Sequence, residues 1–202
     1  NDNIGITLFA GETFTQCPLT VDHAVLLDMI HNIKCGLITD GTAVGMGIAN
    51  AVTRLKDSKA KSKVIILLTD GTNNKGDISP MTAAEIAKSF GIRVYTIGVG
   101  TNGMAPYPYP VGNTVQYVSM PVEIDEKTLT EIAGTTDGNY FRATSNSKLK
   151  EVYEEIDKLE KTKLNVKEYS KRDEEYHWFA LAAFLCVLLE VLLRNSVLKK
   201  IP

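Results

Sequence analysis

Residues 64–74 read VIILLTDGTNN, and this stretch decides the fold of the chain. Its first five residues are aliphatic and leave no polar face, which is typical of a parallel strand that is buried on both sides. Thr69, Asp70 and Gly71 follow directly, so the strand ends on a carboxylate and a turn. In open α/β sheets, ligands bind beyond the carboxyl ends of the strands. The stretch therefore predicts that Asp70 lies at the functional edge of a buried sheet.

Strand-like and helix-like segments alternate along the rest of the chain. The predicted strands are 3–10, 13–19, 64–68, 93–100 and 139–144, of which the first two pair as a hairpin. The predicted helices are 21–33, 42–56, 81–90, 126–133 and 147–161. Strands separated by helices indicate an α/β fold with a doubly wound, mostly parallel open sheet of the Rossmann type.

Several of these helices carry start signals and apolar stripes. We expect Thr20, Ser79 and Asp125 to be N-caps, and Gly91 to end the helix at 81–90. The inward stripe expected for the helix at 21–33 is Ala24, Leu27, Ile30 and Ile33. The inward stripe expected for the helix at 42–56 is Val44, Ile48, Val52 and Leu55.

Composition and charge exclude some classes of protein. The chain has 202 residues and is 44% hydrophobic, enough for one sizeable core. Its 22 Lys and Arg residues nearly balance its 24 Asp and Glu residues, so no basic field predicts a nucleic-acid partner. Cys17, Cys35 and Cys186 show no zinc-ligand spacing. A bridge between Cys17 and Cys35 is one alternative, and two buried thiols without a bridge are the favoured one.

The two ends of the chain differ in character. Residues 178–193 are apolar apart from Glu190, and aromatic residues precede them. This pattern predicts a transmembrane helix at 176–198, after an α/β domain at 1–163 and a linker at 164–175. The alternative is a buried or self-associating helix, because an ionisable group in lipid is costly. The other end enters a strand pattern without an initiator Met, so we expect a piece of a longer protein.

Thr42 is the second candidate site residue. It follows Asp40 and Gly41 and directly precedes the predicted helix at 42–56, so its hydroxyl is expected at the same edge as Asp70. Each residue has a simpler reading: Thr42 as an N-cap and Asp70 as part of a local turn. Together, however, a hydroxyl and a carboxylate supply the oxygen ligands that a hard divalent cation prefers.

These two motifs resemble the von Willebrand factor type A (VWA) domain and its metal-ion-dependent adhesion site. Thr42 matches the Thr of that site, and Asp70 matches its last Asp. The Asp-x-Ser-x-Ser loop that completes the site is absent, and the resemblance implies that the first strand, which leads into that loop, is missing too. The resemblance implies Mg²⁺ (or Mn²⁺ or Ca²⁺) at an incomplete site. It also implies that Thr42 binds directly, that Asp70 acts through water, and that a partner's acidic side chain completes the shell.

A longer resemblance links the chain to the bacterial aerotolerance (Bat) family, of the BatA type. The stretches that carry it are LFAGETFTQCPLT, GTAVGMGI, LLTDGTNNKGDISP, VYTIGVGT and TDGNYFRAT. The resemblance implies a protein of the bacterial inner membrane whose VWA domain faces the periplasm. It also implies a role in an envelope complex rather than catalysis, with other Bat and VWA proteins and a MoxR-type ATPase as partners.

The segment at 101–121, TNGMAPYPYPVGNTVQYVSMP, follows the predicted strand at 93–100 and is therefore expected at the same edge. Its Tyr107, Tyr109 and Tyr117 are candidates for a partner-binding surface, because aromatic residues are enriched at interfaces. The alternative is a hairpin that is stiffened by proline and covers the end of the sheet.

Two enzyme motifs are partly matched. Residues 98–103 fit GxGxxG, but the proline-rich segment that follows cannot open the helix that a dinucleotide site needs. LLTDGT resembles the phosphatase loop of the haloacid dehalogenase family, but Thr69 stands where that family has its nucleophilic Asp. We therefore expect a binding module and no enzyme, with a metal-dependent phosphatase of that family as the alternative.

Overall fold

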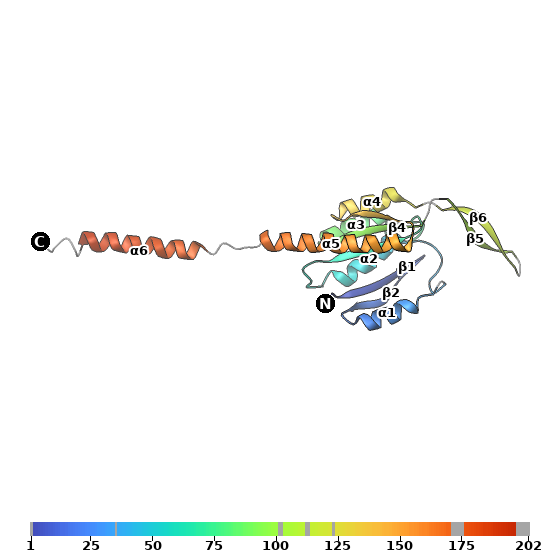
Figure 1. Cartoon of the computed structure of the whole chain (residues 1–202), viewed down its shortest axis with the longest axis horizontal. Coiled ribbons are helices and arrows are strands. Elements are labelled where there is room, and N and C mark those ends of the chain that lie inside the picture. The colour runs from blue at the N-terminus through green and yellow to red at the C-terminus, as the bar shows by residue number, and fades with distance from the viewer. Residues whose placement is uncertain are drawn as a thin grey trace. The chain divides into compact units, whose positions relative to one another are not determined.

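The computed structural model describes residues 2–34, 36–100, 103–111, 114–122, 124–170 and 176–196. The chain forms two compact units, Asn1–Glu160 and Lys161–Pro202. The strands are β1 (Ile4–Phe9), β2 (Thr13–Thr20), β3 (Val64–Thr69), β4 (Arg93–Val99), β5 (Gly103–Val111), β6 (Thr114–Val122) and β7 (Tyr140–Ala143) (Figure 1). The helices are α1 (His23–His31), α2 (Val44–Leu55), α3 (Pro80–Ser89), α4 (Glu126–Thr135), α5 (Asn146–Ser170) and α6 (Tyr176–Ser196).

The described strands form three separate sheets. β3, β4 and β7 make a parallel sheet in the order β3-β4-β7. β1 and β2 pair as an antiparallel hairpin, and β5 and β6 pair as another. The predicted parallel sheet and the predicted hairpin of the first two strands are both confirmed.

Helices cover both faces of the parallel sheet, as a doubly wound fold requires. Along β3, alternate side chains enter two different cores: Ile65 and Leu67 pack with α2, α3 and α4, whereas Ile66 and Leu68 pack with α5. Burying an aliphatic side chain of this size contributes roughly 1.5–3 kcal/mol. This two-sided burial is the reason that residues 64–68 have no polar position.

Most of the predicted helix signals hold. Ser79 accepts a hydrogen bond from the Thr82 N–H as the N-cap of α3, and Asp125 caps α4 through the Thr128 N–H. Gly91 follows the end of α3 with a φ of 64°, a left-handed conformation that glycine adopts without strain. On α2, the buried residues include Val44, Ile48 and Val52, as the predicted stripe requires.

The prediction for the helix at 21–33 is wrong in two respects. Its N-cap is Asp22, whose carboxylate accepts from the N–H groups of Ala24 and Val25, whereas Thr20 accepts from the Asp22 N–H. The expected stripe is also not buried, because Leu26 is the buried residue of α1. The physical reason is that α1 packs on β1 and β2, and a two-stranded sheet is too narrow to cover a full helix face.

Two of the three cysteines lie in the described part of the chain. Cys17 is a buried thiol without a bridge, and its S–H donates to the Pro18 carbonyl oxygen over 3.3 Å. Cys186 is an exposed thiol on α6. Cys35 lies outside the described residues, but the free Cys17 thiol is not bridged to it, so the favoured alternative of unbridged thiols holds for Cys17.

The predicted membrane segment corresponds to α6. In the portion of the chain that the structure describes, no helix has both the length and the apolar character that a membrane crossing requires. The predicted span at 176–198 is therefore not confirmed.

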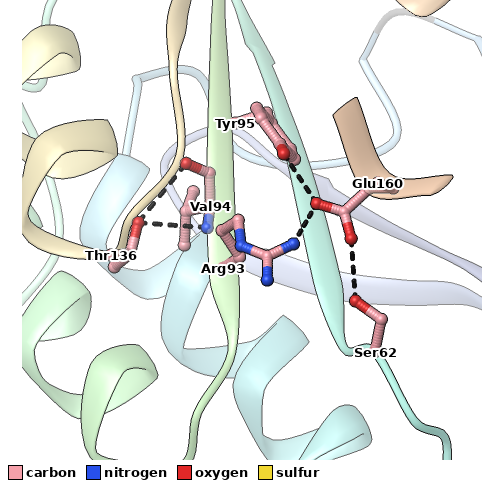
Figure 2. Close-up of polar contacts among 6 residues, drawn as sticks. All are labelled: Ser62, Arg93, Val94, Tyr95, Thr136 and Glu160. Carbon is pink, nitrogen blue, oxygen red and sulfur yellow. Dashed lines mark hydrogen bonds and ion pairs between the residues drawn. The ribbon is translucent and has the colours of Figure 1, made fainter. Parts of the chain in front are cut away.

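The first half of β4 has no strand beside it on the β7 side, because pairing with β7 begins at Thr96. The hydroxyl of Thr136, just after α4, takes the place of a strand there: it accepts from the Val94 N–H over 3.0 Å and lies 3.3 Å from the Val94 carbonyl oxygen (Figure 2). A buried backbone N–H without a partner costs about 1–3 kcal/mol. Thr136 therefore satisfies a buried strand edge with a side chain.

A polar cluster fixes α5 to the amino end of the sheet. The Glu160 carboxylate accepts from the Tyr95 hydroxyl over 2.6 Å, from the Ser62 hydroxyl over 2.8 Å, and from the Arg93 guanidinium (Figure 2). The side chains of Arg93 and Glu160 are only 14% and 15% exposed. A buried carboxylate of this kind is stable only because donors surround it.

Burial and hydrogen bonding shift the pKa values of this cluster. Burial, together with the nearby Glu160 carboxylate, raises the pKa of Tyr95 to about 12. Burial also acts to raise the pKa of Glu160, but hydrogen bonds from Arg93, Tyr95 and Ser62 outweigh it and hold that pKa below its ordinary value. Glu160 therefore contributes stability that is present above its unfolded-state pKa and is lost as pH falls through its folded-state pKa. Tyr95 contributes stability that is lost as pH rises through about 12.

The substitution Glu160→Gln tests the role of this cluster. We expect it to lower the free energy of unfolding by roughly 1–3 kcal/mol at pH 7, because Arg93 loses a charged partner in a largely buried site. The loss should shrink in acid, where the wild-type carboxylate is itself protonated. Urea unfolding at pH 7, and at a series of lower pH values that extends well below the ordinary pKa of a glutamate, measures both effects.

The matched control is Glu151→Gln on the same helix, which removes an exposed pair with Lys148. It should change stability by less than about 0.5 kcal/mol. Equal losses in the two variants would show that the cluster has no special role.

Candidate metal site at the carboxyl end of the sheet

Three loops meet at the carboxyl end of β3. They are the turn after β1, the loop before α2 and the loop after β3. Backbone hydrogen bonds join the first two: the Gly11 N–H donates to the Thr39 carbonyl and the Ala43 N–H donates to the Ala10 carbonyl, both over 2.7 Å. Gly11 and Gly41 approach so closely that a Cβ on either would collide with the other loop, or with Lys75 in the case of Gly41. Both positions therefore need glycine.

The loop after β3 is bonded to the start of α2 by two asparagines. The Asn73 side-chain oxygen accepts from the Val44 N–H over 2.8 Å, and the Asn74 side-chain oxygen accepts from the Thr42 N–H over 2.9 Å. In return, the Asn74 N–H donates to the Thr42 carbonyl over 3.0 Å. The N-cap residue of α2 is Ala43, which makes no side-chain cap bond. Asn73 thus caps α2 from a different loop.

This arrangement leaves the Thr42 hydroxyl available. Thr42 is not the N-cap, so the simpler reading of this residue is wrong. Its hydroxyl oxygen lies 3.3 Å from the point where a Cβ on Gly71 would stand, so Thr42 sits directly beside the Asp70-Gly71 turn. The Thr42 hydroxyl and the turn that contains Asp70, far apart in sequence, are therefore neighbours at this edge.

A buried hydroxyl holds the turn that carries Asp70. The Thr69 hydroxyl accepts from the Gly71 N–H over 3.3 Å, and Thr69 is only 6% exposed. The side chain of Asp70 is exposed. Within the described ranges, no hydrogen bond engages either the Asp70 carboxylate or the Thr42 hydroxyl. Both groups present unpaired oxygen atoms on the same edge.

The chemistry of these oxygens fits a hard divalent cation, but their number does not complete its shell. Mg²⁺ takes six oxygen ligands and keeps several waters. Thr42 and Asp70 supply two donors, and the described residues contain no cluster of three or more His, Cys, Asp or Glu side chains that could hold a metal. Further oxygens must come from water, from a partner or from residues outside the described ones.

The three tyrosines are placed on the β5-β6 hairpin. In its register, position 107 is opposite Val118, position 109 is opposite Gln116, and Tyr117 is opposite Pro108. Tyr117 is 72% exposed, whereas the side chains of Tyr107 and Tyr109 lie outside the described ones. Figure 1 shows the hairpin extending away from the α/β body as a ribbon of two strands. The segment is thus a hairpin, but nothing shows that it covers the end of the sheet, and the use of its tyrosines in binding stays a prediction.

Asn73 and Asn74 carry no signal in the sequence that marks them as parts of this site. They follow the Asp-Gly turn directly, and asparagine in such a position usually stabilises its own turn. Here both side chains reach across to α2 instead. Only the spatial closeness of the two loops shows this role.

The chain matches a known protein family over most of its length. The sequence pattern of the von Willebrand factor type A domain matches residues 1–155. The chain belongs to the VWA family. Relatives within it include the BatB protein of Bacteroides thetaiotaomicron, which is 34% identical in sequence. Its crystal structure matches with a TM-score of 0.68, and the match covers 80% of this chain and 80% of that one. An aerotolerance-related membrane protein from Bacteroides fragilis is 31% identical with a TM-score of 0.65, over 78% of this chain and 80% of that one.

A third VWA neighbour bears on metal binding. Proximal thread matrix protein 1 of the mussel byssus, in a structure described as having a zinc-occupied metal-ion-dependent adhesion site, is 26% identical with a TM-score of 0.59. The match covers 78% of this chain and 34% of that one. This chain spans 59% and 50% of the length of the two curated relatives that it matches first. The matches show a VWA domain and do not show the activity of the whole protein.

Removal of the Asn73 side chain, which caps α2 from another loop, should destabilise the first turn of α2. In Asn73→Ala the Val44 N–H loses its acceptor, so we expect a loss of about 1 kcal/mol in the free energy of unfolding. Amide hydrogen exchange in the first turn of α2 should rise as well. Thr72→Ala, an exposed position in the same loop, is the control and should leave both quantities unchanged. A similar effect from both substitutions would refute the cap.

Proposed function

We propose that the VWA domain of this chain is a protein-binding module that depends on a divalent cation and works in a bacterial envelope complex. The observation that carries the proposal is that the Thr42 hydroxyl lies beside the Asp70-Gly71 turn at the carboxyl end of the sheet, and that among the described residues no hydrogen bond engages it or the Asp70 carboxylate. The zinc-occupied site named for a neighbouring VWA structure supports it. The proposed ion is Mg²⁺, with Mn²⁺ or Ca²⁺ as substitutes.

The incomplete shell explains why such a site would bind a protein. With one carboxylate and one hydroxyl from this chain, a divalent ion keeps excess positive charge. An acidic side chain from a partner would neutralise that charge and complete the oxygen shell. The amino end of α2, whose Val44 N–H lies at the same loop, adds a partial positive charge that also favours an incoming carboxylate. In this proposal, Thr42 would hold the ion directly and Asp70 would hold it through water.

The partners follow from the relatives. BatB and an aerotolerance-related membrane protein are among the similar structures, and they support placing this chain with the Bat proteins. We propose other Bat or VWA proteins as partners, with a MoxR-type ATPase as a further one, and we assign the chain to the BatA type. Nucleic acid is not proposed, because the net charge of the chain is −2.

The phosphatase alternative has little support from the site. The residue at the position of its nucleophile, Thr69, is a buried hydroxyl that is bonded within the turn. A buried hydroxyl cannot replace an exposed carboxylate in phosphoryl transfer. We propose no catalytic role for this chain.

Membrane attachment is the second part of the proposal. A relative is described as an aerotolerance-related membrane protein, and α6 exposes large apolar side chains, among them Trp178, Phe179, Phe184 and Leu185. We propose that residues 176–198 anchor the chain in the inner membrane, after a linker at 164–175, with the domain at 1–163 in the periplasm.

Metal binding is tested with Mn²⁺ itself. Titration calorimetry of the full-length protein should show Mn²⁺ binding that Asp70→Asn and Thr42→Val each weaken at least about tenfold, or ~1.4 kcal/mol. The control Thr72→Val changes an exposed hydroxyl in the same loop and should leave binding intact. Lack of Mn²⁺ binding in the full-length protein, or equal affinities in all variants, would refute the metal site. Turnover of p-nitrophenyl phosphate that disappears in Asp70→Asn would instead favour the phosphatase.

Attachment is tested by fractionation. Wild-type protein should stay with the membrane pellet at alkaline pH, whereas a variant that ends at residue 163 should be released, because about 20 apolar residues are needed to hold a span. Release of both forms would remove the membrane part of the proposal and leave the metal site untouched.

A further inference from the structure

The β5-β6 hairpin is a ribbon of two strands with no charged residue. Its sequence from 103 to 122 is GMAPYPYPVGNTVQYVSMPV, and its pairing runs from Gly103 opposite Val122 to Val111 opposite Thr114. Met104 and Tyr117 are 66% and 72% exposed. An isolated hairpin of two strands is marginally stable in water, and further strands stabilise it. The hairpin would therefore gain stability from pairing with a further strand.

The prolines of the hairpin all lie in alternate cross-strand pairs. Pro106, Pro108 and Pro110 are opposite Ser119, Tyr117 and Val115, and Pro121 is opposite Met104. In an antiparallel ladder, pairs that exchange both N–H···O bonds alternate with pairs that exchange none. Proline has no N–H, so these four pairs are the ones that exchange none. The backbone groups at these positions therefore point outward, to the two edges of the ribbon, which pair with no other described strand.

The two edges are consequently unequal. On the outer edge of β5, three of the four outward positions are proline, and only Met104 has an N–H to offer. On the outer edge of β6, the outward positions are Val115, Tyr117, Ser119 and Pro121, so three N–H groups are available. Proline at an edge prevents further pairing. A new strand can therefore add to β6 but not to β5.

We propose that β6 pairs with β6 of a second copy of this chain, so that two hairpins form one antiparallel sheet of four strands. An edge paired with its own copy about a two-fold axis is self-complementary when the strands are antiparallel. The absence of charge between residues 103 and 122 removes the repulsion that two identical edges would otherwise feel. The proline edges of β5 then form both outer edges of the sheet, so the assembly ends at two copies and does not grow into a fibre. This interface is independent of the metal site.

The register with the longest overlap gives a specific geometry. Val118 is the middle residue of β6 (Thr114–Val122), so it faces Val118 of the second copy on the two-fold axis. Ser119 and Tyr117 of the second copy then exchange both backbone bonds. Val118 directs its own backbone groups to β5, so across the axis it forms a pair without hydrogen bonds, with Cα atoms about 4.5 Å apart. This distance falls within the range of about 4.4–6.8 Å that a disulfide needs.

Disulfide trapping tests the interface in the full-length protein. In a background with Cys35→Ser and Cys186→Ser, and with the buried Cys17 retained, Val118→Cys should form a linked dimer under mild oxidation. The matched control is Gln116→Cys, an exposed position on the same strand that the two-fold axis does not bring near its copy. We expect Val118→Cys to cross-link at least about tenfold faster, since pairing raises the effective concentration of the two thiols.

Proline variants test the edge itself. Ser119→Pro removes an outward N–H from β6 without removing a bond to β5, and should abolish rapid cross-linking of Val118→Cys. Met104→Pro does the same on the outer edge of β5 and should leave cross-linking unchanged. All of these measurements are made in EDTA, so their result does not depend on the proposed cation.

Three outcomes would overturn the inference. They are equal cross-linking rates at positions 116 and 118, no effect of Ser119→Pro, and a monomer by sedimentation with no trapped dimer. If β6 instead pairs with a strand of another protein, the purified chain would give the third result. Lack of Mn²⁺ binding, with disulfide cross-linking of Val118→Cys intact, would refute the proposed metal site and leave this interface standing.

Discussion

The rest of the structure depends on the burial of one parallel sheet on both of its faces. β3, β4 and β7 lie between helices, so neither face is open to a ligand. Parallel strands tolerate this burial because their backbone groups are paired along the sheet. Where pairing stops early, at Val94, the Thr136 hydroxyl takes over. Only the two ends of the sheet remain for polar chemistry.

The two ends of the sheet differ in whether their polar groups are hydrogen-bonded to one another. At the amino end, the Glu160 carboxylate gathers three donors and fixes α5, so the polar groups there satisfy one another. At the carboxyl end, backbone and asparagine bonds hold three loops together, yet the Thr42 hydroxyl and the Asp70 carboxylate stay unpaired among the described residues. A satisfied cluster stabilises a fold, whereas a rigid site with unpaired oxygens is suited to an external ion.

The β5-β6 hairpin is a separate sheet of two strands, and Met104, Tyr117 and Val118 are exposed on it. Its prolines sit where no bond to the neighbouring strand is lost, which is how a sequence so rich in proline forms strands at all. The same placement closes one edge and leaves the other open. In the proposed dimer, this placement would limit association to two copies.

The sequence by itself determined the α/β class, the buried strand at 64–68, the antiparallel first hairpin and the pairing of Thr42 with Asp70 as candidates, because periodicity and strand ends are local properties. It failed at α1, where the apolar stripe had no broad sheet to cover. It also could not show that Asn73 caps α2, that Glu160 joins Arg93 and Tyr95, or that Gly71 lies under Thr42. Only the tertiary structure decided these contacts, because each joins loops or elements whose distance in space no local pattern encodes.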